Sequence, residues 1–419
     1  MLACALPFVL ACGSEHGSIG GAGGGSGAGG AGGAGAAAAG KSGSACIEIL
    51  ANAPGVSIAL EEWARPDDGQ IKLLSRTYSS DTAWMNLQSY GSSGARLLDV
   101  SLEFSPATAS VVSNCAWRSD AYLCAIDSFS SIGSSADAKL PTNISVFPKE
   151  DNIIAVHWDG ETFSLHATSQ NPQAGALQLI RLDTSGKVIQ PRTHVGDGVF
   201  GSFTPERSRV VTDPKSGRTF VVAGSSLEAM VASAHERDGT LLFAKGSVLS
   251  TTPNIVSQYP AVGVYGDGAL IATQGDRTAS VMWPKPNFYH LSAAGQLTVL
   301  PKIPLADEEV VDSNIQIAMV AHGPNDGWLA LSTVDSKSGS RLVLLDWKDG
   351  AFGPIQVIMD AHDVVPAKKD YFLRLVDPIA FELDGQRWVG VKDWTVSAKP
   401  AVRLFRVDDP SCRYAPISP

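Results

Sequence analysis

Eight side chains stand in polar segments next to short apolar runs, where they could hold a ligand or move a proton. They are Asp276, Arg277, Asp312, Asn314, Asp335, Lys392, Asp393 and Trp394. A set that mixes acids, basic groups and an indole suits a glycan or a peptide, because it offers both hydrogen bonds and a flat apolar surface. Two neighbouring carboxylates could instead act as the acid and base of glycoside cleavage. Asp276, Asp312 and Asp393 are the candidates for that second chemistry.

No established catalytic or metal motif accompanies these residues. The sequence lacks the H-E-x-x-H, G-x-S-x-G, Walker A and EF-hand patterns, and it has no Cys-x-x-Cys pair. The acidic segments Asp213–Gly217 and Asp335–Gly339 carry a Lys where calcium would need a ligand, which favours hairpin turns. We expect His157, His166 and His290 to be packed or surface residues of strands, and the other histidines to lie in turns or linkers. We therefore expect no metal and no cofactor.

The charge balance limits the class of partner. The 419 residues carry 32 basic and 42 acidic side chains, a formal net charge of −10. A nucleic-acid partner would require a basic face, so we expect none. No apolar run approaches the roughly 20 residues that cross a bilayer as a helix.

The N-terminal segment points to a lipid anchor. Met1–Ala11 is a short apolar run, and Cys12 follows it directly. Val9-Leu10-Ala11-Cys12 resembles the bacterial lipobox. The resemblance implies that residues 1–11 are a removed signal peptide, that Cys12 carries the lipid, and that the membrane is a partner.

Residues 12–45 are predicted to form a tether. The segment is almost wholly Gly, Ala and Ser beyond His16. Such a composition buries too little apolar surface to offset its chain entropy, so we expect disorder. A flexible coil of about thirty residues has a mean reach of roughly 30 Å. The folded domain is then residues 46–419, held away from a membrane surface.

Setting aside Cys4 and Cys12 leaves four cysteines, which in a secreted protein predict two disulfides rather than free thiols. Three pairings are possible. Cys115 and Cys124 lie symmetrically about Ser119-Asp120, so a two-residue turn there would place them opposite each other on paired strands. The remaining pair is then Cys46 with Cys412, near the two ends of the folded domain.

The elements that must position these residues are strands. Residues 315–358 contain four runs of β-branched and aromatic residues, separated by Asn-Asp-Gly, by a Ser-Gly turn and by Lys-Asp-Gly. That pattern indicates hairpins, and four strands in one antiparallel meander form a propeller blade. Pro, Gly and Ser occur too often elsewhere for helices of useful length. The sequence therefore predicts an all-β protein.

The turn between the first and second strand of each blade recurs along the chain. We place it at Gly69, Asp120, Gly160, Gly217, Gly268, Gly327 and Gly385. Propeller repeats span about 40 to 50 residues, close to these intervals. We expect a β-propeller of seven four-stranded antiparallel blades, with six as the alternative. The last blade has only three strands from the C-terminal end, so Cys46–Leu50 is expected to supply its fourth.

Together these features resemble secreted bacterial β-propeller lipoproteins. In propellers, ligands bind over the channel mouth, at the loops between strands 2 and 3 and between consecutive blades, where the eight side chains above are expected. The resemblance implies an outer-membrane or surface lipoprotein in the cell envelope, and we expect a monomer. We expect a non-catalytic protein that binds a protein, peptide or polysaccharide; the alternative is a propeller glycoside hydrolase or polysaccharide lyase.

Overall fold

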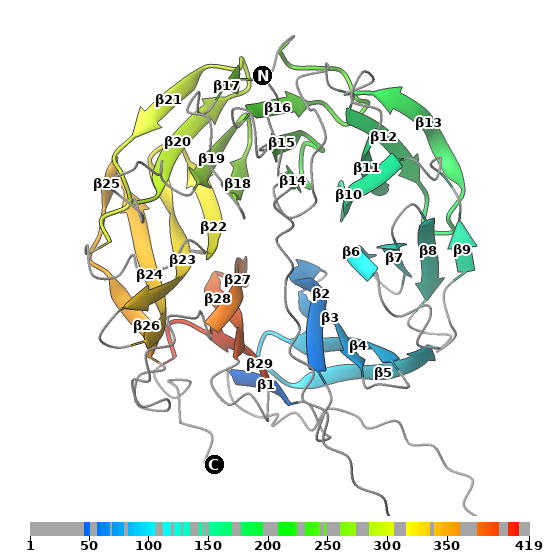
Figure 1. Cartoon of the computed structure of the whole chain (residues 1–419), viewed down its shortest axis with the longest axis horizontal. Coiled ribbons are helices and arrows are strands. Elements are labelled where there is room, and N and C mark those ends of the chain that lie inside the picture. The colour runs from blue at the N-terminus through cyan, green and yellow to red at the C-terminus, as the bar shows by residue number, and fades with distance from the viewer. Residues whose placement is uncertain are drawn as a thin grey trace, which may run out of the picture. The chain divides into compact units, whose positions relative to one another are not determined.

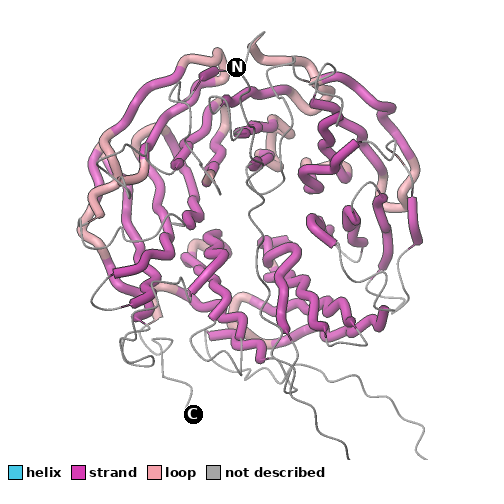
Figure 2. Tube along the Cα trace, in the orientation of Figure 1, coloured by secondary structure: helices cyan, strands magenta, loops and turns pink. Residues whose placement is uncertain are grey.

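Short apolar runs separated by Gly-containing turns form β-strands throughout the computed structural model. The structure describes residues 46–50, 57–67, 69–78, 83–104, 112–118, 121–126, 129–134, 142–144, 146, 151–169, 177–195, 208–223, 231–243, 247–248, 260–273, 285–305, 316–335, 339–360, 375–393 and 401–409. These residues form strands and connecting segments, without a helix (Figure 2). Within them, nothing helical is available to span a bilayer. The predicted all-β class is confirmed.

The described strands form seven antiparallel sheets within the unit of residues 35–419. The first three sheets are β2 (Ser57–Asp67), β3 (Gln70–Tyr78), β4 (Ala83–Gly91), β5 (Arg96–Phe104); β6 (Val112–Arg118), β7 (Ala121–Ile126), β8 (Phe129–Ser134), β9 (Thr142–Ile144); and β10 (Asp151–Trp158), β11 (Phe163–Ser169), β12 (Leu177–Leu182), β13 (Val188–His194).

The next two sheets are β14 (Ser208–Thr212), β15 (Thr219–Ala223), β16 (Val231–His235), β17 (Ser247–Val248); and β18 (Ala261–Tyr265), β19 (Gly268–Thr273), β20 (Asn287–Ser292), β21 (Leu297–Leu300). The last two are β22 (Gln316–Gly323), β23 (Asp326–Asp335), β24 (Gly339–Lys348), β25 (Ala351–Phe352), β26 (Gln356–Asp360); and β1 (Cys46–Leu50), β29 (Ala401–Arg406), β28 (Gln386–Asp393), β27 (Leu375–Leu383).

One edge strand of each sheet contacts the corresponding edge strand of the next sheet. The contacts run from β2 through β6, β10, β14, β18 and β22 to β27, and β27 in turn contacts β2. These edge strands are the inner ones of their sheets (Figure 1). Sheets that follow one another around a closed series of inner strands define a β-propeller.

The apolar core is divided among the junctions between consecutive sheets. Each described cluster of buried apolar residues draws on two neighbouring sheets. Ile71 and Tyr90 of the β2–β5 sheet, for example, pack with Ile47, Trp388 and Leu404 of the last sheet. Burial of apolar side chains therefore stabilises the junction that closes the ring, as it does the other described junctions.

The strand nearest the N-terminus completes the last sheet, as predicted. β1 pairs antiparallel with β29, with Cys46 opposite Phe405 and Leu50 opposite Ala401. This pairing covers an edge that would otherwise expose unpaired backbone groups. Cys412 lies outside the described residues, so its bond with Cys46 stays a prediction.

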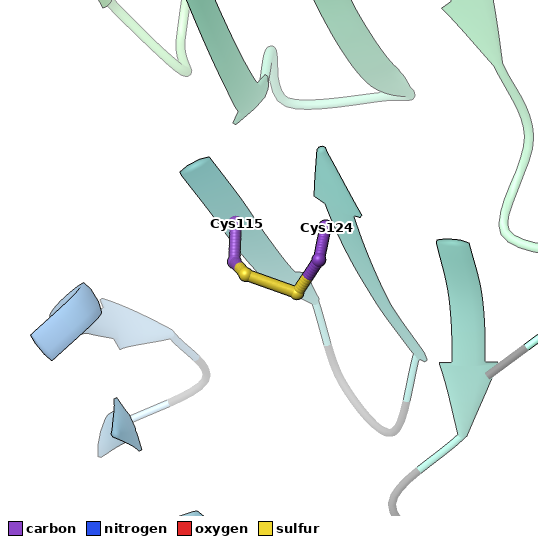
Figure 3. Close-up of a disulfide and its surroundings, with 2 residues drawn as sticks. All are labelled: Cys115 and Cys124. Atoms are coloured by element: carbon purple, nitrogen blue, oxygen red, sulfur yellow. A yellow bond between two sulfur atoms is a disulfide. The ribbon is translucent and has the colours of Figure 1, made fainter. Parts of the chain in front are cut away.

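The predicted disulfide between Cys115 and Cys124 is present. Cys115 of β6 lies directly opposite Cys124 of β7, and their sulfur atoms are bonded (Figure 3). Their Cα atoms are 4.0 Å apart, close to the spacing of a non-hydrogen-bonded antiparallel pair. Both residues are fully buried in the cluster between the β2–β5 and β6–β9 sheets.

Two details of the strands differ from the sequence pattern. The segment Phe129–Ser134 contains a single β-branched residue and a glycine, a composition poor in strand formers, yet it forms β8 and pairs with β7 along its length. The run Phe352–Ile358 was expected to be one strand, but it divides into β25 and β26 around Gly353 and Pro354. Proline has no backbone N–H, so it cannot continue the ladder to β24.

Candidate functional site

The structure describes part of the predicted ligand site. Asp276, Arg277, Asp312, Asn314 and Trp394 lie outside the described residues.

Three of the eight predicted residues are in strands. Asp335 is the last residue of β23, opposite Gly339. Lys392 and Asp393 are the last residues of β28. All three lie where their strands lead into the predicted ligand loops.

Asp377 has an unusual backbone conformation close to Lys392. It lies in β27 with φ of 50°, in the left-handed region, and Pro378 follows it. The pairing of β27 with β28 shifts register between Val376 and Ile379, so Asp377 is part of a bulge. A non-glycine residue in the left-handed region costs about 1 to 3 kcal/mol, and such strain concentrates at functional sites.

Two ion pairs surround this bulge. Lys392 Nζ lies 2.5 Å from Asp377 Oδ2, and the two side chains are 15% and 38% exposed. Arg403 Nε of β29 donates to Asp393 Oδ2 at 2.7 Å, and Asp393 is only 1% exposed. The Lys392–Asp377 pair is therefore partly open to a ligand, while the Asp393–Arg403 pair belongs to the interior of the sheet.

The bulge is also joined to the preceding sheet. The backbone N–H of Asp377 donates a hydrogen bond to Oε1 of Gln316, the first residue of β22. Gln316 itself is nearly buried. We call Gln316, Asp377, Lys392, Asp393 and Arg403 the Asp377 cluster.

The Asp377 cluster suits recognition better than proton transfer. The Asp393 carboxylate is buried and paired with the Arg403 guanidinium, so it does not face a substrate. Lys392 and Asp377 present one positive and one negative group side by side, which can bind a polar or zwitterionic ligand group through charge-assisted hydrogen bonds. Among the described residues, no group of acids, histidines and cysteines is arranged to hold a metal ion.

Gln316, Asp377 and Arg403 were not among the predicted site residues. The Asp377-Pro378 dipeptide was an available signal, because Asp-Pro favours turns and irregular backbone within a strand pattern. Gln316 and Arg403 had no comparable signal, since their role depends on which strands become neighbours.

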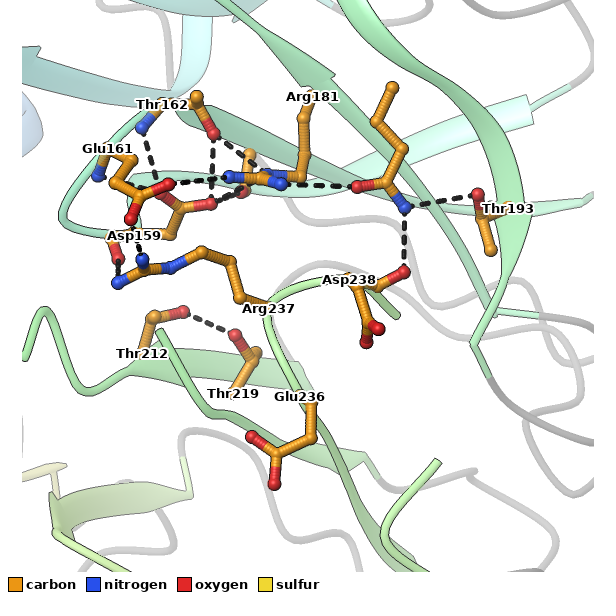
Figure 4. A network of polar contacts seen from close by, with 12 residues as sticks. Asp159, Glu161, Thr162, Arg181, Thr193, Thr212, Thr219, Glu236, Arg237 and Asp238 are labelled. Atoms are coloured by element: carbon orange, nitrogen blue, oxygen red, sulfur yellow. Dashed lines mark hydrogen bonds and ion pairs between the residues drawn. The ribbon is translucent and has the colours of Figure 1, made fainter. Parts of the chain in front are cut away.

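A second concentration of polar contacts lies at the β10–β11 turn (Figure 4). The buried Asp159 carboxylate accepts hydrogen bonds from the backbone N–H groups of Glu161 and Thr162, from the hydroxyl of Ser164 and from Arg181 Nε. Burial by itself would raise the pKa of Asp159. These hydrogen bonds and the Arg181 charge outweigh it and bring the pKa below the ordinary value.

This network also spans a junction. Arg237, in the turn after β16, donates to the backbone carbonyl of Asp159 at 3.1 Å and forms an ion pair with Glu161. The Asp159 carboxylate is bound on all sides by groups of the protein itself, so we assign the network to stability rather than to ligand binding.

Solved structures align with most of this chain. The WD40 domain of SCAP from fission yeast aligns with a TM-score of 0.46 and 10% identity, over 87% of this chain and 99% of its own. A mutant of AofleA from Arthrobotrys oligospora gives 0.43 and 11%, over 87% and 90%. Prolyl oligopeptidase B from Galerina marginata gives 0.44 and 11%, over 81% of this chain and 47% of its own. Likenesses of this strength assign neither a family nor an activity.

No protein-family profile matches the sequence, and no curated protein matches it. The class that strand pairing and inner-strand contacts define is the β-propeller.

Proposed function

We propose that this chain is a lipid-anchored, envelope-exposed propeller of seven blades that binds a protein, peptide or polysaccharide. The count of blades is supported by the seven sheets of the described residues and by the contact between β27 and β2. The anchor at Cys12, the removal of residues 1–11 and the tether 12–45 are supported by the lipobox-like Val9–Cys12 sequence and the Gly/Ala/Ser composition. The proposed location is the outer membrane or cell surface, as a monomer.

The observation that carries the binding function is the partly exposed Lys392–Asp377 ion pair on a strained strand end. Lys392 was expected at the channel mouth, in the loop after the second strand of its blade. Asp377 lies at the start of the first strand, so both flank the same end of the sheet. A ligand group bridging the pair would contact the entrance of the ring.

The alternative function, a glycoside hydrolase or lyase, loses one of its three candidate carboxylates. A general acid or base must reach the substrate, but Asp393 is buried and its carboxylate is bound by Arg403. A glycoside hydrolase or lyase would then depend on Asp276 and Asp312.

A ligand screen tests the proposal. The melting temperature of the full chain is measured with peptidoglycan fragments, other glycans, peptides, divalent metals and chelator. A ligand present at a hundred times its dissociation constant adds about 2.7 kcal/mol to the free energy of unfolding, a shift that melting detects. Turnover of a glycan that binds would favour the alternative function.

A pair of variants of one strand localises the binding. Lys392→Gln is expected to weaken binding of a hit at least tenfold, because it removes the positive charge of the partly exposed ion pair in the Asp377 cluster. Arg387→Gln is the matched control: Arg387 is a basic residue of the same strand, paired with Asp346 and Asp408 near the opposite end. Equal loss of binding in both variants would place the ligand elsewhere.

A further inference from the structure

Three histidines meet between the β10–β13 and β14–β17 sheets. Strand register places His157 opposite Ser164, and His166 opposite Ala155, on one face of the first sheet. Side chains of directly opposed residues lie on the same face of a sheet. His235 lies in β16, opposite Thr219. His235 was predicted to lie in a turn or linker, but it is a residue of β16 and is in contact with His166.

The three rings are in direct contact. The His157 and His166 rings stack with centroids 4.9 Å apart, and the His166 and His235 centroids are 5.1 Å apart. His166 Nε2 lies 2.9 Å from His235 Nε2. All three side chains are at most 1% exposed. We call them the histidine seam.

The hydrogen bonds assign the protons of His235 and His166. His235 Nδ1 lies 2.8 Å from the carbonyl oxygen of Glu236, so Nδ1 carries a proton and donates it. Neutral His235 then has a bare Nε2, which accepts a hydrogen bond from Nε2–H of His166. The remaining nitrogen of neutral His166, Nδ1, is buried without a hydrogen-bond partner.

The seam fits only neutral rings. A proton added to His235 would enter at Nε2, where it would face the N–H of His166 at hydrogen-bond distance. A proton added to His166 would enter at the buried Nδ1. In both cases a cation forms in an apolar interior beside other imidazoles, which is unfavourable without a paired anion.

The anions on the described elements around the seam are engaged with other partners or act on it from the turn after β16. The same layer contains the hydroxyls of Thr212 and Thr219, which bond each other at 2.7 Å. Charged groups on the packed elements include Arg181 and Asp159 on the β10–β13 sheet, with Glu161 beside them, and Arg218, Glu236, Arg237 and Asp238 on the β14–β17 sheet, where Arg218 pairs with Glu236. The Asp159 carboxylate is committed to Arg181, and Glu161 forms ion pairs with Arg181 and Arg237.

The titration of the seam follows from this setting. Burial, and then the proximity of His157 and His235, holds the pKa of His166 well below its ordinary value. Burial lowers the pKa of His235 to about 4, although the hydrogen bond to Glu236 and the charges of Asp238 and Glu236 oppose the shift.

The apolar part of this junction is also the least aromatic. Its cluster consists of Ile, Ala, Leu and Val residues, such as Leu179 of the first sheet and Val210 and Val221 of the second. Each of the other described junction clusters contains at least one Trp, Tyr or Phe, for example Trp347. Aromatic side chains bury the largest apolar areas, so this junction gains less stability from buried aromatic area than the other described junctions.

We propose that the histidine seam makes the junction between the β10–β13 and β14–β17 sheets an acid-sensitive opening point of the propeller. At neutral pH the neutral rings of His166 and His235, packed with His157, close the junction. When the junction is open, these histidines bind protons as the pH falls below about 6.5, whereas the closed seam excludes protons. Acid therefore favours the open state, and the two sheets separate at this junction before the other junctions open.

The expected size of the pH effect on opening can be calculated for a single histidine. For a pKa that moves from 6.5 in the open state to about 4 in the closed state, the opening constant rises about 30-fold between pH 8 and pH 5. A second histidine of the seam adds to that factor.

Native-state hydrogen exchange of the full chain measures this opening. Exchange of β11 and β16 is compared at pH 8 and pH 5, after correction for intrinsic rates, with exchange of β23 and β24 as the internal reference. We expect opening of β11 and β16 to rise at least tenfold more than that of the reference strands. Equal acceleration in all sheets, or none in β11 and β16, would overturn the proposal.

Variants separate the seam from a general acid effect. His166→Leu removes the central imidazole and should reduce the pH dependence in β11 and β16 at least threefold. His290→Gln is the matched control, because His290 is a strand histidine of the β18–β21 sheet outside the seam. If His166→Leu does not fold, His235→Gln takes its place. A seam variant that folds and keeps the full pH response would overturn the proposal.

Discussion

Arg237 lies against the bare backbone of Gly217. A Cβ atom on Gly217 would stand 2.0 Å from Arg237 Nε, and the residue has φ of 73°. The guanidinium that closes onto Asp159 and Glu161 from the next sheet therefore reaches its place because position 217 has no side chain. The junction depends on a glycine that takes part in neither the ion pair with Glu161 nor the hydrogen bond to Asp159.

Gly217→Ala is accordingly expected to destabilise the protein more than an ordinary turn substitution. Gly69 is the matched control, with φ of 72° and no atom within 4 Å of its Cβ position. Gly69→Ala should cost about 1 to 2 kcal/mol from backbone strain alone. Gly217→Ala should cost about 1 to 3 kcal/mol more from the displaced Arg237. Urea unfolding measures both, and equal losses would contradict the steric account.

Asp159→Asn tests the buried network. The variant leaves Arg181 without its buried carboxylate partner and with only the longer contact to Glu161, and we expect a loss of about 3 kcal/mol at pH 7. Because the folded pKa of Asp159 is lowered, its contribution is present above its unfolded pKa and disappears as the pH falls through the folded value. The difference between wild type and variant should shrink below about pH 4. A difference independent of pH would contradict this origin.

Cys12→Ser tests the lipid anchor. A thioether-linked lipid cannot form on serine, so the variant should move from the membrane fraction to the soluble fraction after expression in a bacterial host that processes lipoproteins. Wild-type protein and a Cys4→Ser variant are the controls, and both should remain in the membrane fraction. Unchanged partitioning of Cys12→Ser would rule out the anchor.

The disulfides make a separate prediction. Peptide mapping without reductant should recover a Cys115–Cys124 peptide and a Cys46–Cys412 peptide. Replacing both Cys115 and Cys124 by Ala removes a short closed loop, and the free energy of unfolding should fall by up to about 3 kcal/mol. A Cys46–Cys115 peptide would contradict both pairings.

Local patterns in the sequence were sufficient to predict most of the strands. Alternating apolar residues and Gly-containing turns predicted the hairpins of the β22–β26 sheet, and the orphan strand Cys46–Leu50 was predicted to join the last sheet, as it does. The opposition of Cys115 and Cys124 could be predicted because it depends only on the turn between them. Each of these features is decided within a few residues or by the need to close an open edge.

The contacts that give each site its chemistry were decided by the tertiary structure. His166 and His235 are 69 positions apart, and Asp377 and Gln316 are 61 apart. Their meeting depends on the register of two sheets across a junction, and register across a junction leaves no periodic signal in the sequence. The sequence by itself determined which segments become strands, where they turn and how the last sheet is completed. Only the packing of one sheet against the next decided which side chains share a buried layer, because that packing is a relation between separate hairpins.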